Sequence, residues 1–364
     1  MKTENRSLPI RDDLSGALQR AWNRLSQPGT WWDGKQRLEI VAAARHAARC
    51  QLCKDRKAAL SPGMVQGNHD LQGNLSPAAI DCIHRIATDS ARLTESWYRG
   101  LLEQGVSDCE YVEIVSLVNM ITALDTFDRA IGAPIQVLPA AVTGEPTRKR
   151  PRAAKTGTAW VPTVFPEDLT EDDPDPYTQF HAFNIQLALG LVPQEVINFF
   201  DLDTTLYLSE DEIEDLDVEK RAISRIQMEL IASRGASING CHYCATCHSL
   251  HLHKLGQAAN EDFDLDGILN GGTSENGIEH GALIIAFVDA VLGVSDGDID
   301  DIRDELYQKI GAKGLVDTAA TIASFNSIVR VANATGTQLD RLVTDQLQDL
   351  SGSASWLNYV PDKN

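Results

Sequence analysis

The chain has 364 residues, a formal net charge of −20 and a hydrophobic content of 43%. This hydrophobic content supports a sizeable buried core and excludes a largely disordered chain, and the length is enough for about two domains. The strong negative charge argues against nucleic acids and anionic membranes as partners, because binding to a polyanion relies on basic surface.

The first residues of the chain are polar and lack the apolar core of a signal peptide. We therefore expect a cytoplasmic protein whose cysteines are reduced at rest. The chain has seven cysteines, and four of them form two C-x-x-C pairs. In a reducing compartment this spacing indicates redox or metal chemistry rather than structural disulfides.

Apolar residues recur at three- and four-residue spacing along most of the chain, and strand patterns are scarce, so the sequence predicts an all-α fold. In the N-terminal part a helix that contains Glu39 is predicted to precede the pair Cys50 and Cys53. Ser107, with acidic residues directly after it, is typical of the start of a further helix. These elements form a first unit, residues 1–137.

Residues 138–177 contain seven prolines together with glycines, a basic run and an acidic run. Few helices can form in such a composition, so this stretch is predicted to be a linker. It leads to a second unit, residues 178–345, and the chain closes with a tail, residues 346–364.

The second unit repeats the order of elements in the first. A helix that contains Glu229 precedes the pair Cys241 and Cys244, an apolar helix follows, and a polar helix start at Ser295 leads into a long last helix. The apolar helix, residues 282–294, carries a charge and is too short to span a bilayer, so we expect no membrane anchor. We predict two tandem copies of one helical bundle.

The second C-x-x-C pair continues into the pattern C-x-x-C-x-x-x-H. An Asn-Gly pair before Cys241 is typical of a turn, so Cys241 is expected in the first turn of a helix, where backbone N–H groups favour a thiolate. Cys244 lies on the same helix face, close enough to form a disulfide. His248, one turn further, is placed to take a proton from Cys244, and Glu229 is placed to orient His248.

The full pattern, E-x11-C-x-x-C-x-x-x-H with a tyrosine before the second cysteine, resembles the carboxymuconolactone decarboxylase/alkylhydroperoxidase D superfamily. The last long helix, with Phe325-Asn326, Arg330 and Gly336, also resembles the closing segment of that family. The resemblance implies an AhpD-like all-α bundle that commonly forms homo-oligomers. It also implies reduction of alkyl hydroperoxides through a redox-active disulfide, with no metal or other cofactor.

The same resemblance implies a role for each residue of the second pattern. Cys244 is expected to attack the peroxide and Cys241 to resolve the oxidised sulfur, while His248 and Glu229 form a proton relay. An external dithiol or a disulfide-reductase partner would then reset the pair.

The pair Cys50 and Cys53 forms a candidate second site. Lys57 occupies the position that His248 has in the second unit, and Glu39 lies one residue closer to the cysteines. A lysine ammonium favours a neighbouring thiolate but is a poor proton acceptor at neutral pH. We therefore interpret this pair as a degenerate structural copy, with a second redox site as the alternative.

Three other functions compete with a peroxidase. A metal site around Cys241 is disfavoured because structural zinc sites usually draw ligands from two separated clusters, and no second cluster accompanies this one. A lyase that acts on a carboxylated lactone is the alternative within the same superfamily. A non-catalytic redox sensor, whose disulfide changes its partners, is the third.

Overall fold

The fold is helical throughout the part of the chain that the computed structural model describes, residues 8–70, 73–179, 181–271 and 276–350. These residues form no β-strand, and one isolated antiparallel bridge joins Lys155 and Thr163. The predicted all-α fold is therefore confirmed. Among the same residues, no helix is both long enough and apolar enough to cross a membrane.

The N-terminal half begins with a short helix that packs on the other half, followed by five helices around the first cysteine pair. These helices are α1 (Asp12–Arg24), α2 (Gly34–Ala47), α3 (Gln51–Ala58), α4 (Pro77–Asp89), α5 (Glu95–Glu103) and α6 (Asp108–Ile131). Ser107 starts α6 through a capping box with Glu110, and Gly132 ends it in the left-handed conformation (φ 76°). The predicted helix start at Ser107 is confirmed.

The C-terminal half contains the second cysteine pair and a long closing helix that a kink at Gly311 (φ 73°, ψ 178°) divides in two. Its helices are α7 (Asn184–Leu187), α8 (Pro193–Leu206), α9 (Glu210–Glu214), α10 (Arg225–Ile238), α11 (His242–Ala259), α12 (Leu265–Asn270), α13 (Gly281–Leu292), α14 (Ile299–Thr335) and α15 (Arg341–Asp349). The cap of α14 is Asp298, three residues after the predicted start at Ser295. The Asp298 carboxylate accepts hydrogen bonds from two backbone N–H groups of the first turn, which stabilises the later start.

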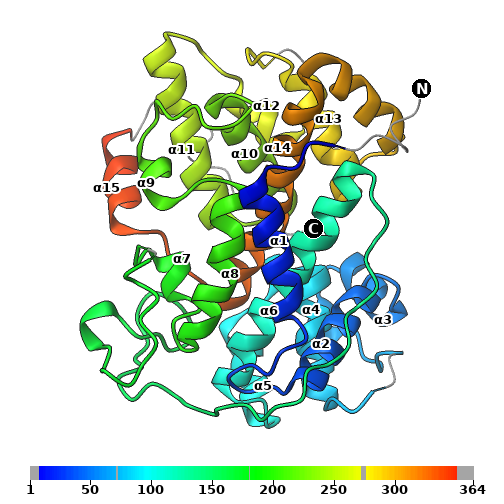
Figure 1. Ribbon diagram of the computed structural model, residues 1–364, viewed down its shortest axis with the longest axis vertical. Coiled ribbons are helices and arrows are strands. Elements are labelled where there is room, and N and C mark those ends of the chain that lie inside the picture. The colour runs from blue at the N-terminus through cyan, green and yellow to red at the C-terminus, as the bar shows by residue number, and fades with distance from the viewer. Residues whose placement is uncertain (1–7, 71–72, 180, 272–275, 351–364) are drawn as a thin grey trace.

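Residues 138–177 contain no α-helix, as their proline content predicts, and include one 3-10 turn, Pro166–Asp168. In Figure 1 this stretch runs down one edge and along the bottom of the molecule. It is attached to the helices, since the Trp160 N–H donates a hydrogen bond of 2.7 Å to the Thr335 carbonyl at the end of α14.

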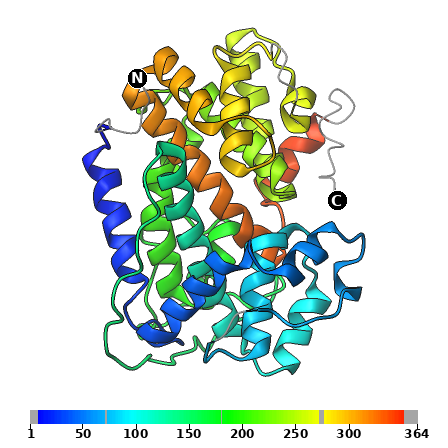
Figure 2. The same cartoon turned by 90° about the vertical axis from the view of Figure 1, so that its right-hand side faces the viewer.

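The two halves meet along α6 and α14, which pack against each other more extensively than any other pair of described helices. Figure 1 shows α2–α5 at one end and α10–α13 at the other, and in Figure 2 α14 runs obliquely between the two groups. One hydrophobic core includes residues of both halves. The Tyr111 hydroxyl also donates to the Ala334 carbonyl across this interface. The two halves are therefore packed together through a shared core.

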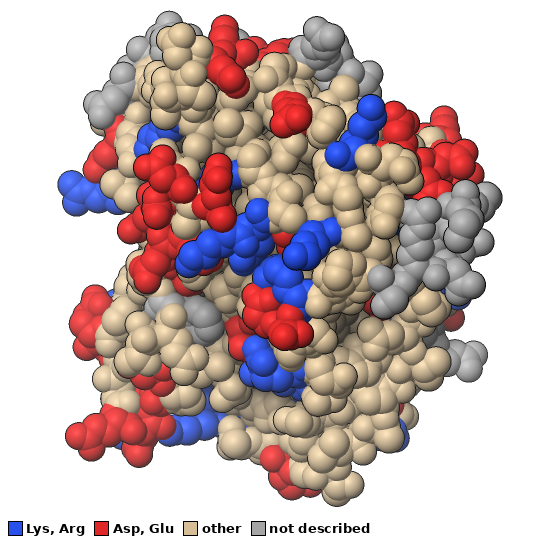
Figure 3. All heavy atoms as spheres, turned by 45° about the horizontal axis from the view of Figure 1, so that its top comes forward, with Lys and Arg blue, Asp and Glu red and all other residues tan. Residues whose placement is uncertain are grey.

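The outer surface carries charges of both signs. On the face shown in Figure 3, the basic side chains form a short band near the middle that lies next to acidic side chains. Acidic side chains also occur along the edges of this view, in keeping with the net charge of −20.

Candidate active site

The second cysteine pair lies at the start of α11, as the sequence predicts. Gly240 adopts a left-handed conformation (φ 58°) between α10 and α11, which turns the chain. Cys241 is the N-cap of α11, and its Sγ accepts a hydrogen bond of 3.4 Å from the backbone N–H of Cys244. Both cysteines are buried, and no disulfide joins them. The helix start therefore holds the two sulfur atoms on one face, in the first turn.

The structure brings Glu229 and His248 together. Glu229 lies in α10 and His248 in α11, and these two helices pack side by side. The His248 Nδ1 atom lies 2.8 Å from a carboxylate oxygen of Glu229. The imidazole is also held by Phe325, whose ring centre lies 4.4 Å from its own in an edge-to-face arrangement. His248 thus has a defined orientation one helical turn after Cys244.

Three further side chains surround Glu229, which is fully buried. The Arg225 Nε–H donates a hydrogen bond of 2.7 Å to Glu229, and the Tyr207 hydroxyl donates a second to the same oxygen. The His251 Nδ1 atom lies 3.7 Å from that oxygen. None of the three was predicted from the sequence to contact Glu229. Arg225 and His251 were accessible to such a prediction, because they lie four and three residues from Glu229 and His248 on the same helices.

The charges of this group define which nitrogen of His248 holds the proton. Burial alone would raise the pKa of Glu229, but His248 and His251 hold it well below its ordinary value. Burial lowers the pKa of His248 despite the opposing effect of Glu229, so the ring is neutral at neutral pH. An ionised carboxylate only accepts hydrogen bonds, so Nδ1 carries the proton and Nε2 presents a lone pair.

The Cys244 thiol is protonated at rest. Its contact with Cys241 and its burial raise the pKa of Cys244 well above the ordinary value of a thiol. Burial likewise raises the pKa of Cys247, an additional thiol three residues further along α11. A base is therefore needed to form the Cys244 thiolate, and the lone pair of His248 is one turn away.

Cys244, Cys247 and His248 line a cavity of about 400 Å³. Most of its wall is apolar, with contributions from Phe183, Ile185, Phe200, Leu208, Phe325 and Ile328. Asp203 also lines it, and burial raises the pKa of this carboxyl to about 7. The cavity therefore offers an apolar ligand a place beside a thiol and a neutral imidazole.

The first cysteine pair has a different set of neighbours from those the sequence predicts. Cys50 is the N-cap of α3, and its Sγ lies 3.4 Å from the Nδ1 of His69. The Sγ of Cys53 lies 3.3 Å from the Nδ1 of His84. Burial lowers the pKa of His84 to about 4, so this imidazole is neutral. Two histidines that the sequence analysis missed therefore face these thiols.

Lys57 lines the same cavity as Cys53, whereas Glu39 does not line it. One Glu39 oxygen accepts a hydrogen bond of 2.8 Å from the Asn74 side chain, and Lys57 is exposed to solvent. Glu39 and Lys57 were predicted to act on the thiols by analogy with Glu229 and His248 of the second unit. Helix α3 has 8 residues and α11 has 18. The chain that follows α3 therefore places different side chains beside the thiols.

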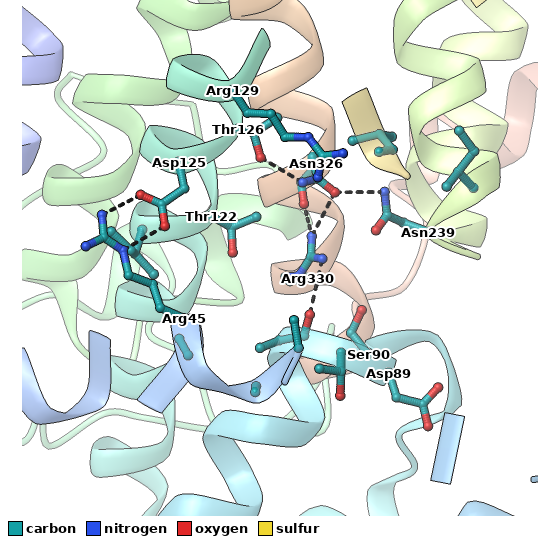
Figure 4. Close-up of a pocket in the computed structure, with 18 of the residues that line it drawn as sticks. Arg45, Asp89, Ser90, Thr122, Asp125, Thr126, Arg129, Asn239, Asn326 and Arg330 are labelled. Atoms are coloured by element: carbon teal, nitrogen blue, oxygen red, sulfur yellow. Dashed lines mark hydrogen bonds and ion pairs between the residues drawn. The ribbon is translucent and has the colours of Figure 1, made fainter. Parts of the chain in front are cut away.

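A second cavity, of about 800 Å³, lies between the two halves and is lined by both polar and apolar residues. Helix α3 contributes Cys53 to its wall, and the turn before Cys241 contributes Asn239. Figure 4 shows Arg330 and Asn326 reaching into this space from α14, with Asn326 within hydrogen-bonding distance of Asn239. Burial lowers the pKa of Arg330 to about 10. The two cysteine segments thus border one shared cavity, and of the two only the second lines the apolar cavity as well.

No protein-family model, curated protein or solved structure matches this chain.

Proposed function

We propose that this protein is a thiol-dependent hydroperoxide reductase in which Cys244 is the nucleophile. The observation that carries the proposal is the Glu229–His248 pair, buried beside a C-x-x-C helix start at the wall of an apolar cavity. A carboxylate that accepts from one imidazole nitrogen leaves the other nitrogen free to act as a base. This arrangement activates nucleophilic thiols and hydroxyls in several unrelated enzyme classes.

In the first step, the Nε2 of His248 takes the proton from the Cys244 thiol as the sulfur attacks the terminal peroxide oxygen. The O–O bond breaks, and the leaving alkoxide receives the proton from His248. The products are an alcohol and a sulfenic acid on Cys244, so the sulfur is oxidised by two electrons and the peroxide is reduced by two. Glu229 stabilises the imidazolium that forms in between.

In the second step, the Cys241 sulfur attacks the sulfenic sulfur of Cys244. A disulfide forms and water leaves, carrying the hydroxyl of the sulfenic acid and the proton of the Cys241 thiol. An external dithiol then exchanges with this disulfide, which returns both cysteines to thiols and leaves the reductant as a disulfide. The protein thus ends each cycle unchanged.

The apolar wall of the cavity favours an organic hydroperoxide over hydrogen peroxide. A side chain of the size of Phe200 or Phe325 gains about 2–3 kcal/mol on leaving water, and an apolar substrate gains in the same way when it is buried against such residues. Hydrogen peroxide has no apolar part to bury. We therefore expect a lower KM for a bulky alkyl or aryl hydroperoxide.

We further propose that the chain is a two-unit member of the carboxymuconolactone decarboxylase/alkylhydroperoxidase D superfamily. In support, each half has a helix, a following helix capped by the first cysteine of a C-x-x-C pair, and a long closing helix. The closing helices α6 and α14 both end at a left-handed glycine, Gly132 and Gly336. On this proposal residues 1–137 and 178–345 are the two units and residues 138–177 join them.

The test is turnover of cumene hydroperoxide by the full chain with dithiothreitol as reductant. We expect Cys244→Ser to reduce turnover to the background of dithiothreitol alone, because the nucleophile is lost. Cys247→Ser is the matched control, since it makes the same change one turn away in the same cavity, and it should keep most of the activity.

Two results would contradict the assignment. The first is wild-type turnover in Cys244→Ser, and the second is a loss of activity that follows Cys247 instead. Mass spectrometry of the peroxide-treated protein gives a direct check. The wild type should lose two hydrogens as the disulfide between Cys241 and Cys244 forms, whereas Cys241→Ser should retain one added oxygen on Cys244.

A further inference from the structure

Four metal-ligand side chains converge at the first cysteine pair. The ligand atoms of Cys50, Cys53, His69 and His84 all lie within 4.8 Å of one another. They come from the start of α3, from the segment that follows it and from the middle of α4. We propose that these four side chains bind one Zn²⁺ ion in a tetrahedral Cys2His2 site, to which Cys50 and Cys53 contribute thiolates and His69 and His84 their Nδ1 atoms.

The distances between the ligand atoms match those of a tetrahedral zinc site. With Zn–S bonds of about 2.3 Å and Zn–N bonds of about 2.0–2.1 Å, tetrahedral angles separate sulfur from nitrogen by about 3.6 Å. The His69 Nδ1 lies 3.4 Å from the Sγ of Cys50 and 3.7 Å from that of Cys53. The His84 Nδ1 lies 3.3 Å from the Sγ of Cys53. A metal ion shared by the three atoms accounts for both contacts of His69.

A carboxylate behind His69 orients its imidazole as a metal ligand. The His69 Nε2 lies 3.1 Å from Asp81, which also accepts hydrogen bonds from Arg56 and from the Trp97 indole. The carboxylate oxygens accept, so Nε2 of His69 is the donor and Nδ1 is the nitrogen left to bind a metal beside the sulfurs. Metal-binding histidines commonly have such a partner on the second nitrogen.

The Nδ1 atom of His84 faces the group of four ligand side chains, where it contacts the sulfur of Cys53. The His84 side chain is fully buried, and its Nε2 has no hydrogen-bond partner among the described residues. A buried imidazole is costly unless its polar atoms find partners, so coordination through Nδ1 gives this residue a reason to lie in the interior.

The hydrophobic packing around α3 also indicates a structural metal. Cys50, Leu52 and Cys53 form a small cluster with Val65, separate from the main core. The residues that follow α3 are strongly exposed, as shown by Leu60, which is 94% exposed. A segment with so little apolar burial needs another source of stability, and a metal that joins it to α4 supplies one.

The direct test is the zinc content of the full chain, purified without a metal-binding tag and dialysed after incubation with Zn²⁺. Elemental analysis should give one zinc per chain. Cys53→Ser and His69→Ala should each lose most of it, while the matched control Cys82→Ser should retain it. Cys82 is a buried cysteine in α4 that lies outside the cluster, so this control separates loss of a ligand from loss of a buried thiol.

Cobalt substitution in the wild type avoids variants that fail to fold. Replacing zinc by Co²⁺ should produce the visible absorption of tetrahedral cobalt, together with a thiolate-to-cobalt charge-transfer band. A wild-type protein that binds neither metal would overturn the proposal, as would equal loss of zinc in Cys82→Ser. A peroxide-induced disulfide between Cys50 and Cys53 in protein incubated with Zn²⁺ would also overturn it, and would identify the pair as a redox site.

Discussion

The two C-x-x-C segments begin alike and differ in what faces their sulfur atoms. Cys50 and Cys241 are each the N-cap of a helix, and both pairs are buried. In the first segment, two imidazole nitrogens from other parts of the chain converge on the thiols. In the second, His248 follows Cys244 by one turn of the same helix, and both residues line an apolar cavity. The same local motif therefore occurs in two different chemical settings.

A carboxylate behind a histidine occurs in both segments, as Asp81 behind His69 and as Glu229 behind His248. The carboxylate orients the imidazole in both segments, so its presence does not show whether the histidine is a metal ligand or a base. The surroundings of the sulfur atoms separate them. In the first segment two imidazole nitrogens converge on both thiols, which would complete a coordination shell and leave no position for a substrate. In the second, Cys244 lines a cavity, which leaves its sulfur open to attack a peroxide.

The largest expected effect distinguishes the two histidine roles directly. His248→Asn should lower kcat/KM for cumene hydroperoxide by about 10²–10⁴-fold, the range typical for loss of a general base. Its zinc content should equal that of the wild type, because the change lies in the other segment. The exposed His181 provides the matched control, and His181→Asn should alter neither quantity. Wild-type turnover in His248→Asn would show that His248 is not the general base, and the histidines of the two cysteine segments would then not differ in this role.

The next prediction concerns Asp203, which lines the apolar cavity beside Cys244 and whose carboxyl has a pKa of about 7 because of burial. The unfolded chain releases this proton near pH 4, so the stabilisation is complete below that pH and is lost as the pH rises through about 7. The free energy of unfolding should therefore fall by about 2–4 kcal/mol between pH 5 and pH 8 through this group.

Urea denaturation at the two pH values measures the effect of Asp203. Asp203→Asn should show a smaller dependence on pH than the wild type, since the amide does not titrate. An equal dependence in the two proteins would assign the titration to another group. Glu113, whose pKa burial raises to about 7, is the first alternative to examine.

The smallest of the three effects concerns Glu229, which orients the base His248. Glu229→Gln should lower peroxide turnover by about 10–100-fold, because partners that orient a functional histidine typically contribute that much. The negative charge of Glu229 raises the pKa of His248, so its removal should also move the acid limb of the pH–rate profile to lower pH. A purely structural role of Glu229 would lower activity without moving that limb.

Local features of the sequence were enough to predict much of the second segment. The Asn-Gly turn, the cysteine spacing and the position of His248 all lie within one helix and its start, where a residue's number determines the face on which it lies. The helix start at Ser107 and the disrupted residues 138–177 are predictable for the same reason, since caps and prolines act on their immediate neighbours. Glu229 lies on another helix, so its role as the partner of His248 was an expectation from the family resemblance and not from helical spacing.

The neighbours of the first segment could not be predicted in this way. His69 and His84 follow Cys53 by 16 and 31 residues, and a long connection and another helix bring them back to it. Tyr207 contacts Glu229 from the end of α8, and no sequence pattern predicts this contact. The sequence by itself determined the helices, their ends and which residues share a helix face. Only the tertiary structure decided which faces meet, because the packing of helices depends on the complementary shape of distant side chains throughout the core.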